Sequence, residues 1–438
     1  MMALRGFLLR LISGERLAYA GLQAVLLQAV AVLLNVVTGV ITARVLGAEG
    51  RGLYAAATTW AVLLGSLSTA GLSHGLLIQT RQRTASSRPI FLCGLLWTIG
   101  VATVLSAAAA VYMPLLLGAR AAAALDLARA SLVLVHLGAL GVLVRQAYAG
   151  QGRYLAANLS TFTPTLLHAV LLVAFLVSGR LSVATSIVSV VGGSTLALLA
   201  LAPPLLRRLQ GSLSDLGRVW RDLADFGRRA LFADLFALCV TWADRLILLH
   251  LLSPAQLGLY VVAASLAHRI TVFTPKTSLL LSAMSGEQRD RAVQLHNLSL
   301  RVTIAVFIPL VAALFLIDRM VMTTVYGPAF SAAAVVFRVL VVERVVGRLA
   351  SISSQLFLAL GRPGLNSLIR GVELCVLVVA LINLAPKHGA VGAAWGLLAA
   401  TSVRLVLSWA FLVSRLQLPF PRLWLSRGDL VGMRAMLD

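Results

Sequence analysis

Three arginines in one apolar stretch of the sequence have the types and spacing to bind an anion. Arg338, Arg344 and Arg348 lie in the stretch 329–357, and at 100° per residue a helix places them within an arc of about 120°. Guanidinium groups bind phosphate oxygens through paired hydrogen bonds, so this face suits a phosphate-bearing ligand. We favour this interpretation over packing at a cytoplasmic interface or against lipid phosphates. Glu343 points away from the face and is available to neutralise a neighbour.

Other basic residues in apolar stretches are candidates for lining a substrate path through the membrane. Arg269 and Lys276 are seven residues apart and share a helix face, and Arg404 lies in mid-stretch with no carboxylate within one turn. A charge inside a membrane is costly unless it serves a function or has a partner, so we predict that these residues bind substrate. Four more arginines lie within about two turns of a helix end, where they either line the path or reach the lipid headgroups. These are Arg44, Arg129, Arg145 and Arg301.

Acidic residues in the apolar stretches offer either a coupling-ion site or internal ion pairs. Asp234, Asp244 and Arg245 lie within about 100° of one another around a helix. We favour an ion pair between neighbouring helices over ion coupling. Arg370 and Glu373 are three residues apart and are predicted to form a local pair.

Two stripes of uncharged polar residues predict a wet cavity. One stripe comprises Gln28, Asn35, Thr38 and Thr42, and the other comprises Asn158, Thr161, Thr165 and His168. Their hydroxyl and amide groups suit sugar hydroxyls or water, and they suit hydrogen bonds between helices equally well. Both interpretations stay open.

No motif for covalent, metal or cofactor chemistry accompanies these residues. The cysteines Cys93, Cys239 and Cys375 lie singly in apolar stretches without CxxC spacing or a nearby histidine, and no P-loop occurs. We therefore expect no catalytic residue, no metal site and no cofactor.

The composition explains why the polar residues stand out. Of 438 residues, 60% are hydrophobic and only 12% are charged, and the mean hydropathy is +0.94. A soluble domain carries about 25% charged residues, so this chain cannot cover its surface with polar side chains. It is predicted to be an all-α polytopic membrane protein. The net charge of +22 comes from scattered basic residues rather than a basic arm, so nucleic acid is not an expected partner.

Twelve stretches are long and apolar enough for a spanning helix, which needs about 20 residues. The stretches are 17–45, 53–78, 90–116, 124–149, 155–178, 182–206, 229–252, 257–281, 297–317, 329–357, 365–386 and 390–414. They predict two six-helix bundles, 17–206 and 229–414, joined by a cytoplasmic linker, 207–228. A cytoplasmic amphipathic lead-in, 1–16, and a cytoplasmic tail, 415–438, flank them. This orientation places 20 basic residues in cytoplasmic connections and 5 outside, which favours a multi-pass protein of the inner or plasma membrane with both termini in the cytoplasm.

The two halves repeat each other. Gly-Leu-Tyr begins at Gly52 and Gly258, 206 positions apart; Gly-Arg begins at Gly152 and Gly361, 209 apart; and Asn158 and Asn366 are 208 apart. Because each half has six spans, both copies keep one orientation. Parallel repeats of this kind are related by an axis along the membrane normal and are typical of transporters.

These motifs resemble those of oligosaccharide-lipid flippases. The matching elements are the A-R-x-L-G turn at Ala43 to Gly47, the G-L-Y tripeptides, the V-Y-G-P-A-F segment from Val325, L-A-L-G-R-P-G-L-N-S-L from Leu358 and the H-G-A-V-G turn from His388. Such flippases form the polysaccharide-biosynthesis branch of the superfamily that also contains the MATE multidrug exporters and the lipid II flippases. The resemblance covers essentially the whole chain. It implies two six-helix bundles around a central cavity that opens alternately to the two sides, with an undecaprenyl-pyrophosphate-linked oligosaccharide as cargo.

Residues and resemblance together predict a flippase with a cationic central cavity, not an enzyme. Its expected partners are the lipid-linked oligosaccharide and membrane lipids, with a coupling ion, a polysaccharide polymerase and other assembly proteins as further candidates. A cation-coupled multidrug exporter of the MATE type is the first alternative. It is disfavoured because the first six spans hold a single acidic residue, Asp126, near a helix end. A membrane enzyme acting on lipid-linked sugars is the second alternative, disfavoured by short outer connections and the lack of a DxD motif.

Overall fold

Every regular element in the described part of the chain is a helix. A computed structural model describes residues 17–270, 289–421 and 423. Contacts between residues divide the chain into two units, Met1–Ala255 and Gln256–Asp438. Each unit is described by itself. The linker at 207–228, which the sequence predicts between two repeated six-helix bundles, stays a prediction.

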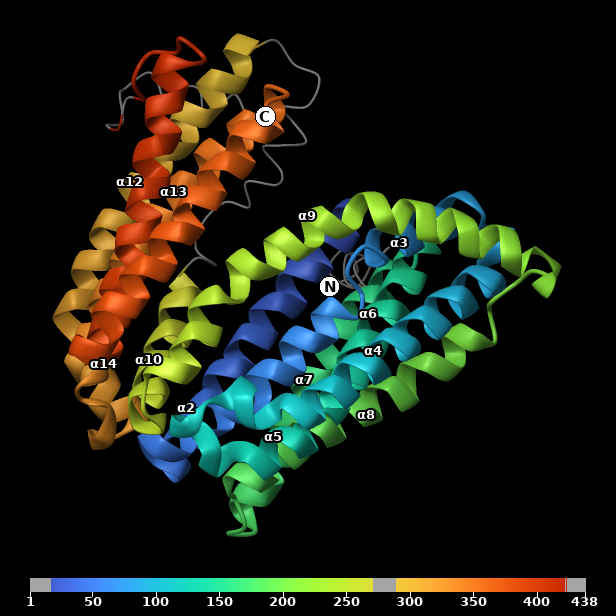
Figure 1. The fold of residues 1–438 in the computed structure, drawn as a ribbon, viewed down its shortest axis with the longest axis horizontal. Helices are drawn as coiled ribbons and strands as arrows, with labels where there is room; N and C mark the ends of the chain where they lie inside the picture. Colours follow the sequence, from blue (N-terminus) through green and yellow to red (C-terminus); the bar gives the residue numbers. More distant parts are fainter. Residues whose placement is uncertain (1–16, 271–288, 422, 424–438) are drawn as a thin grey trace, which may run out of the picture. The chain divides into compact units, whose positions relative to one another are not determined.

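The first unit is a bundle in which α6 packs against α3, α4, α7 and α8 (Figure 1). Its helices are α2 (Leu17–Leu67), α3 (Ser73–Gln82), α4 (Ser87–Leu117), α5 (Leu125–Ser131), α6 (Val133–Gly150), α7 (Tyr154–Val177), α8 (Val183–Leu206) and α9 (Leu216–Leu251). A buried apolar cluster that includes Leu76, Phe91, Leu143, Leu205 and Leu223 joins α3, α4, α6, α8 and α9. Helix α9 therefore packs within this unit.

In the second unit, α13 packs against both α12 and α14 (Figure 1). The elements are α10 (Pro254–Arg269), which begins in the last residues of the first unit, α12 (Arg289–Met320), the π-helical turn η5 (Val321–Tyr326), the 3-10 turn η6 (Pro328–Phe330), α13 (Ala333–Ala359) and α14 (Pro363–Ser414). Leu300 of α12, Ala350 and Ile352 of α13 and Leu405 of α14 form a buried cluster. This packing places α13 between its two neighbours.

Two glycines break the longest helices into paired arms. Gly47 in α2 has φ 67° and ψ −174°, and Gly389 in α14 has φ 58° and ψ −138°. Glycine adopts such left-handed backbone without the clash that a Cβ would cause. In α14 the arms fold back on each other, since a Cβ at Gly392 would lie 2.1 Å from the carbonyl oxygen of Leu384 and one at Gly396 would lie 3.2 Å from Leu381 Cδ2. Helix α14 is thus a hairpin with its turn at Gly389.

The helices account for the predicted membrane crossings. Seven helical stretches of described residues are long and apolar enough to cross a membrane, and two of them, Gln23–Leu67 and Gly364–Ser414, contain the glycine breaks and hold two crossings each. Helices α9, α10 and α13 overlap the predicted stretches 229–252, 257–281 and 329–357 and lie outside these seven. Large apolar side chains face outward, such as Val104 and Leu316 at 68% and 87% exposure, as expected where lipid is the solvent. The predicted all-α polytopic fold is confirmed.

Candidate anion-binding site

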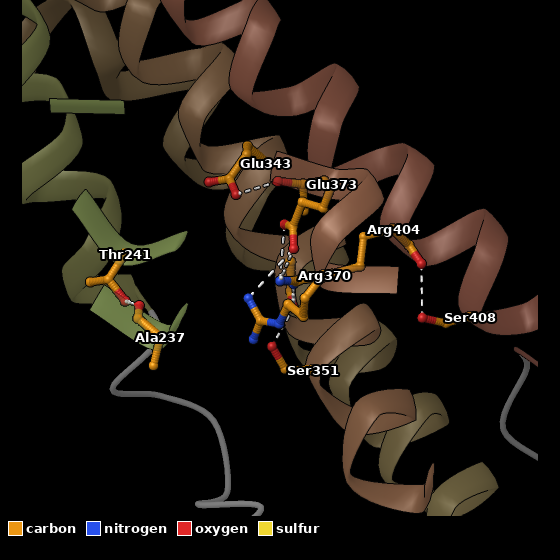
Figure 2. A network of polar contacts seen from close by, with 10 residues as sticks. Ala237, Thr241, Glu343, Ser351, Arg370, Glu373, Arg404 and Ser408 are labelled. Atoms are coloured by element: carbon orange, nitrogen blue, oxygen red, sulfur yellow. Dashed lines mark hydrogen bonds and ion pairs between the residues drawn. The ribbon is translucent and has the colours of Figure 1, made fainter. Parts of the chain in front are cut away.

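The hairpin of α14 brings charged residues from far apart in the sequence against α13. Glu373 lies on the first arm and Arg404 on the second, at similar distances from the turn at Gly389. Because the arms are antiparallel, these two side chains meet across the hairpin. Glu343 and Ser351 of α13 lie beside them (Figure 2), and Arg344 pairs with Glu343. The result is a polar cluster inside an otherwise apolar helix bundle.

Arg404 is the residue that joins the three helical segments. Its Nη1 donates to Oε2 of Glu373 at 3.2 Å and lies 3.1 Å from Oε1, while its Nη2 donates to the carbonyl oxygen of Gly347 at 2.7 Å. Arg404 is only 5% exposed. Figure 2 shows the carboxylate of Glu373 facing the guanidinium groups of Arg404 and Arg370, and Nη1 of Arg370 lies 3.5 Å from Oε2 of Glu373. The predicted local pair of Arg370 and Glu373 is therefore part of a larger cluster.

Glu343 forms the second acidic centre of this cluster. The hydroxyl of Thr401 donates to its Oε1 at 3.0 Å, and Nε of Arg344 lies 2.7 Å from its Oε2. Gly347 lies between the two centres. A Cβ there would be 3.3 Å from Oε1 of Glu343 and 3.6 Å from Nη2 of Arg404. The missing side chain lets the two centres pack together.

The cluster carries more positive than negative charge. It contains three arginines and two glutamates, an excess of one positive charge; the residues are Glu343, Arg344, Arg370, Glu373 and Arg404. The glutamate side chains are 6% and 10% exposed, whereas those of Arg344 and Arg370 are 27% and 31% exposed. Buried acids beside partly exposed arginines leave hydrogen-bond donors for an anion, and guanidinium binds phosphate oxygens in pairs.

The three arginines predicted to share a face of α13 have different surroundings. Arg344 belongs to the cluster, and the half-buried Arg348 lies one turn after it on α13. Arg338 instead pairs with Asp318 at the end of α12: its Nη2 donates to Oδ1 at 3.1 Å and its Nε donates to Oδ2. Asp318 is buried, with 1% of its side chain exposed, so the charge of Arg338 is balanced locally.

The acidic residues of α9 also have individual surroundings. Oδ2 of Asp234 accepts a hydrogen bond from the backbone N–H of Gly71 at 2.7 Å, in the turn between α2 and α3. Asp244 is half-buried, and Arg245 is exposed with its guanidinium carbon 5.0 Å from the ring centroid of Trp242. Asp234 thus ties α9 to a backbone turn, a contact that the sequence did not suggest.

The remaining predicted site residues are spread over both units. Asn35 and Arg44 are exposed on α2, and the amide of Asn35 donates to the carbonyl of Ala31 in its own helix at 2.7 Å. On α7, Asn158 and Thr165 are half-buried and Thr161 is exposed; on α10, Arg269 is half-buried. Lys276 lies outside the described residues. In the described ranges, no group of three histidine, cysteine or acidic residues could hold a metal ion.

Three residues of these sites were not expected from the sequence. Thr401 and Gly347 contact Glu343 and Arg404, and Asp318 pairs with Arg338. A detectable signal existed for Asp318, an acidic residue at the end of an apolar stretch just before the stretch that contains Arg338. Thr401 and Gly347 carry no such signal, since a threonine or glycine in a spanning helix is ordinary.

Comparisons with known proteins agree with this architecture. Residues 41–335 match the family described as "Polysaccharide biosynthesis protein". A solved structure of the lipid II flippase MurJ in an inward closed conformation is similar with a TM-score of 0.74 at 12% identity, over 95% of this chain and 91% of that chain. An inward-facing MATE family multidrug resistance transporter is similar with a TM-score of 0.68 at 14% identity, over 88% and 94%. At these identities the similarity establishes the fold. A sequence comparison with curated proteins finds no match.

Proposed function

Because the chain belongs to the family of polysaccharide biosynthesis proteins, we propose that it is a flippase for an undecaprenyl-pyrophosphate-linked oligosaccharide. The lipid-linked oligosaccharide would cross the plasma membrane by alternating access along a cationic path, from the cytoplasmic to the outer leaflet. The fold, shared with a lipid II flippase and a MATE transporter, supports a transport function rather than an enzymatic one. Both chain termini would lie in the cytoplasm, in keeping with the distribution of basic residues.

The observation that carries this proposal is the positive excess of the α13–α14 cluster. A pyrophosphate in hydrocarbon is strongly disfavoured because it loses its hydration without gaining a partner. The partly exposed side chains of Arg344 and Arg370 would replace that hydration, with Arg348 of α13 as a further donor. Arg404 is buried between Glu373 and Gly347, so we assign it a positioning role. No covalent step is needed, and a polymerase or a coupling ion stays a candidate partner.

The test is the leaflet in which the lipid-linked oligosaccharide accumulates. Spheroplasts from cells lacking the gene are treated with an impermeant glycosidase, with lysed membranes as the control. We expect the oligosaccharide to be cleaved only after lysis, and expression of the wild-type gene to restore cleavage in intact spheroplasts. Equal cleavage with and without the gene would overturn the proposal, and increased resistance to lipophilic cations would then favour the multidrug exporter.

Variants of α13 test the anion site itself. Arg344→Glu with Arg348→Glu should lower outward transfer by about 100-fold, because each charge-assisted contact is worth about 1.5 kcal/mol or more. Replacing the same residues by lysine keeps the charge and should retain most of the transfer. The matched control is Arg415→Glu, an exposed arginine just after α14. Wild-type transfer by the charge-reversed protein would exclude these arginines from the path.

A further inference from the structure

The first unit contains a cavity among α6, α7 and α8 that the proposed function does not use. Its volume is about 230 Å³. The three helices pack against one another around it (Figure 1). Two glycines on α6 provide the space, since a Cβ added at Gly138 or at Gly141 would meet no atom within 4 Å. Most of the lining is apolar, including Leu137, Val142 and Leu198.

Three polar side chains on this lining have unused hydrogen-bonding capacity. Some hydroxyl groups in these helices bond to a carbonyl of their own helix, as Ser160 and Thr195 do at 2.8 Å and 2.9 Å. Among the described residues, the side chains of Arg145, Thr161 and Ser194 have neither a hydrogen bond nor an ion pair, although all three line the cavity. They come from α6, α7 and α8 respectively. Three donors from three helices therefore converge on one space.

The charge of Arg145 is not balanced within these helices. Helices α6, α7 and α8 contain no aspartate or glutamate along their described lengths. Two further arginines, Arg153 and Arg208, lie at the same end of the bundle, within electrostatic range of the hydroxyl of Tyr148. Tyr148 is three residues after Arg145 on α6. The potential around the cavity is positive, which favours an anionic occupant.

The position of the cavity indicates a lipid rather than a soluble anion. Arg145 lies five residues before the end of α6, a helix rise of about 8 Å, so its guanidinium is within reach of the headgroup layer. The predicted orientation places this end in the cytoplasmic leaflet. Basic pockets between spanning helices on that side bind anionic headgroups. The apolar lining deeper in the bundle suits an acyl chain.

We propose that this cavity binds one anionic phospholipid of the surrounding leaflet. The phosphate accepts hydrogen bonds from Arg145, the hydroxyl of Thr161 donates to a phosphate or ester oxygen, the deeper hydroxyl of Ser194 donates to an ester oxygen, and the start of one acyl chain lies against Leu137. The lipid would bridge the three helices and stabilise the first unit. This site is separate from the α13–α14 cluster and does not depend on the proposed cargo.

Binding of defined lipids to the full chain tests this proposal. The purified protein is delipidated and titrated with phosphatidylglycerol or phosphatidylcholine of identical acyl chains, and bound lipid is counted by native mass spectrometry. We expect one phosphatidylglycerol site with at least about tenfold higher affinity than for phosphatidylcholine. Arg145→Gln should lower the affinity for phosphatidylglycerol about tenfold, because one charge-assisted contact is lost. Gly138→Leu should remove the site by filling the cavity.

Matched variants outside the cavity complete the test. Gly100→Leu, where an added Cβ also meets no atom within 4 Å, and Arg180→Gln, an exposed arginine of the same unit, should bind as the wild type does. If Gly138→Leu fails to fold, Thr161→Val together with Ser194→Ala removes two donors at little cost in volume and should weaken binding several-fold. Equal affinity for the two lipids, or unchanged affinity in Arg145→Gln, would overturn the proposal. Displacement of phosphatidylglycerol from the site by undecaprenyl pyrophosphate at a lower concentration would also overturn it, since the occupant would then be the cargo.

Discussion

Arg404→Met removes the buried guanidinium that joins α13 to both arms of α14. Methionine keeps an unbranched apolar stem, so the main change is the loss of the charge and of its contacts to Glu373 and to the carbonyl of Gly347. Glu373, with 10% of its side chain exposed, then relies on the longer contact to Arg370 at 3.5 Å. The variant therefore measures how much this buried ion pair and the bond to Gly347 contribute to the free energy of unfolding.

The expected size of the effect follows from these contacts. A hydrogen bond between helices in a membrane contributes about 0.6 kcal/mol on average, so the three contacts of Arg404 account for about 2 kcal/mol. Removing one partner of a buried pair costs about 3–5 kcal/mol, because the other charge is left without compensation. Arg370 offsets part of that charge. We expect the free energy of unfolding to fall by about 3 kcal/mol.

The measurement is an unfolding titration of the purified protein in mixed micelles with increasing dodecyl sulfate, followed by circular dichroism. The double variant Arg404→Met with Glu373→Gln removes both charges together and should lie within about 1.5 kcal/mol of the wild type. Arg415→Met, at an exposed position, should change stability by less than about 0.5 kcal/mol. A loss below about 1 kcal/mol for Arg404→Met, or strict additivity in the double variant, would refute the reasoning.

Two further predictions use the same titration. Gly347→Ala should lower the free energy of unfolding by about 1 kcal/mol, because its Cβ would lie 3.3 Å from Oε1 of Glu343. The control Gly371→Ala, whose Cβ would meet no atom within 4 Å, should be neutral or stabilising by up to about 1 kcal/mol. Equal effects of the two substitutions would contradict the proposed close packing at Gly347. Asp234→Ala should cost about 1–2 kcal/mol, because the N–H of Gly71 loses its acceptor, while Asp225→Ala, which breaks an exposed pair with Arg228, should cost less than about 0.5 kcal/mol.

The crossings and their breaks could be predicted from the sequence because both depend on local composition. Long apolar runs allow little besides a helix in a bilayer, where each backbone polar group needs a partner within the segment. The predicted turns at 46–52 and 387–389 coincide with the breaks at Gly47 and Gly389, where left-handed backbone favours glycine. The family was recognisable from these same turn motifs, and the match over residues 41–335 confirms it.

Partners across the sequence were harder to predict. Arg404 was predicted to bind substrate because no carboxylate lies within one turn, yet Glu373 contacts it from 31 residues away. Counting outward from Gly389 in both directions would have indicated this pair, since the two residues lie 16 and 15 positions from the turn. The contact of Asp234 with the N–H of Gly71 could not be predicted from residue types, because its donor is a backbone group that every residue except proline carries. Which arginines contact substrate stays a prediction.

The contacts of Arg404 have a mechanical consequence for any transport cycle. Its guanidinium links α13 to both arms of α14, and Arg338 links α13 to the end of α12 through Asp318. Sliding α13 past α14 would separate the buried charges of Glu373 and Arg404, at a cost of several kcal/mol, and sliding α13 past α12 would separate the buried Asp318 from the half-exposed Arg338. Helices α12, α13 and α14 therefore resist sliding past one another and would tilt together as one rigid group. A movement that opens a passage must then occur outside α12, α13 and α14, at hinges in segments without such ion pairs.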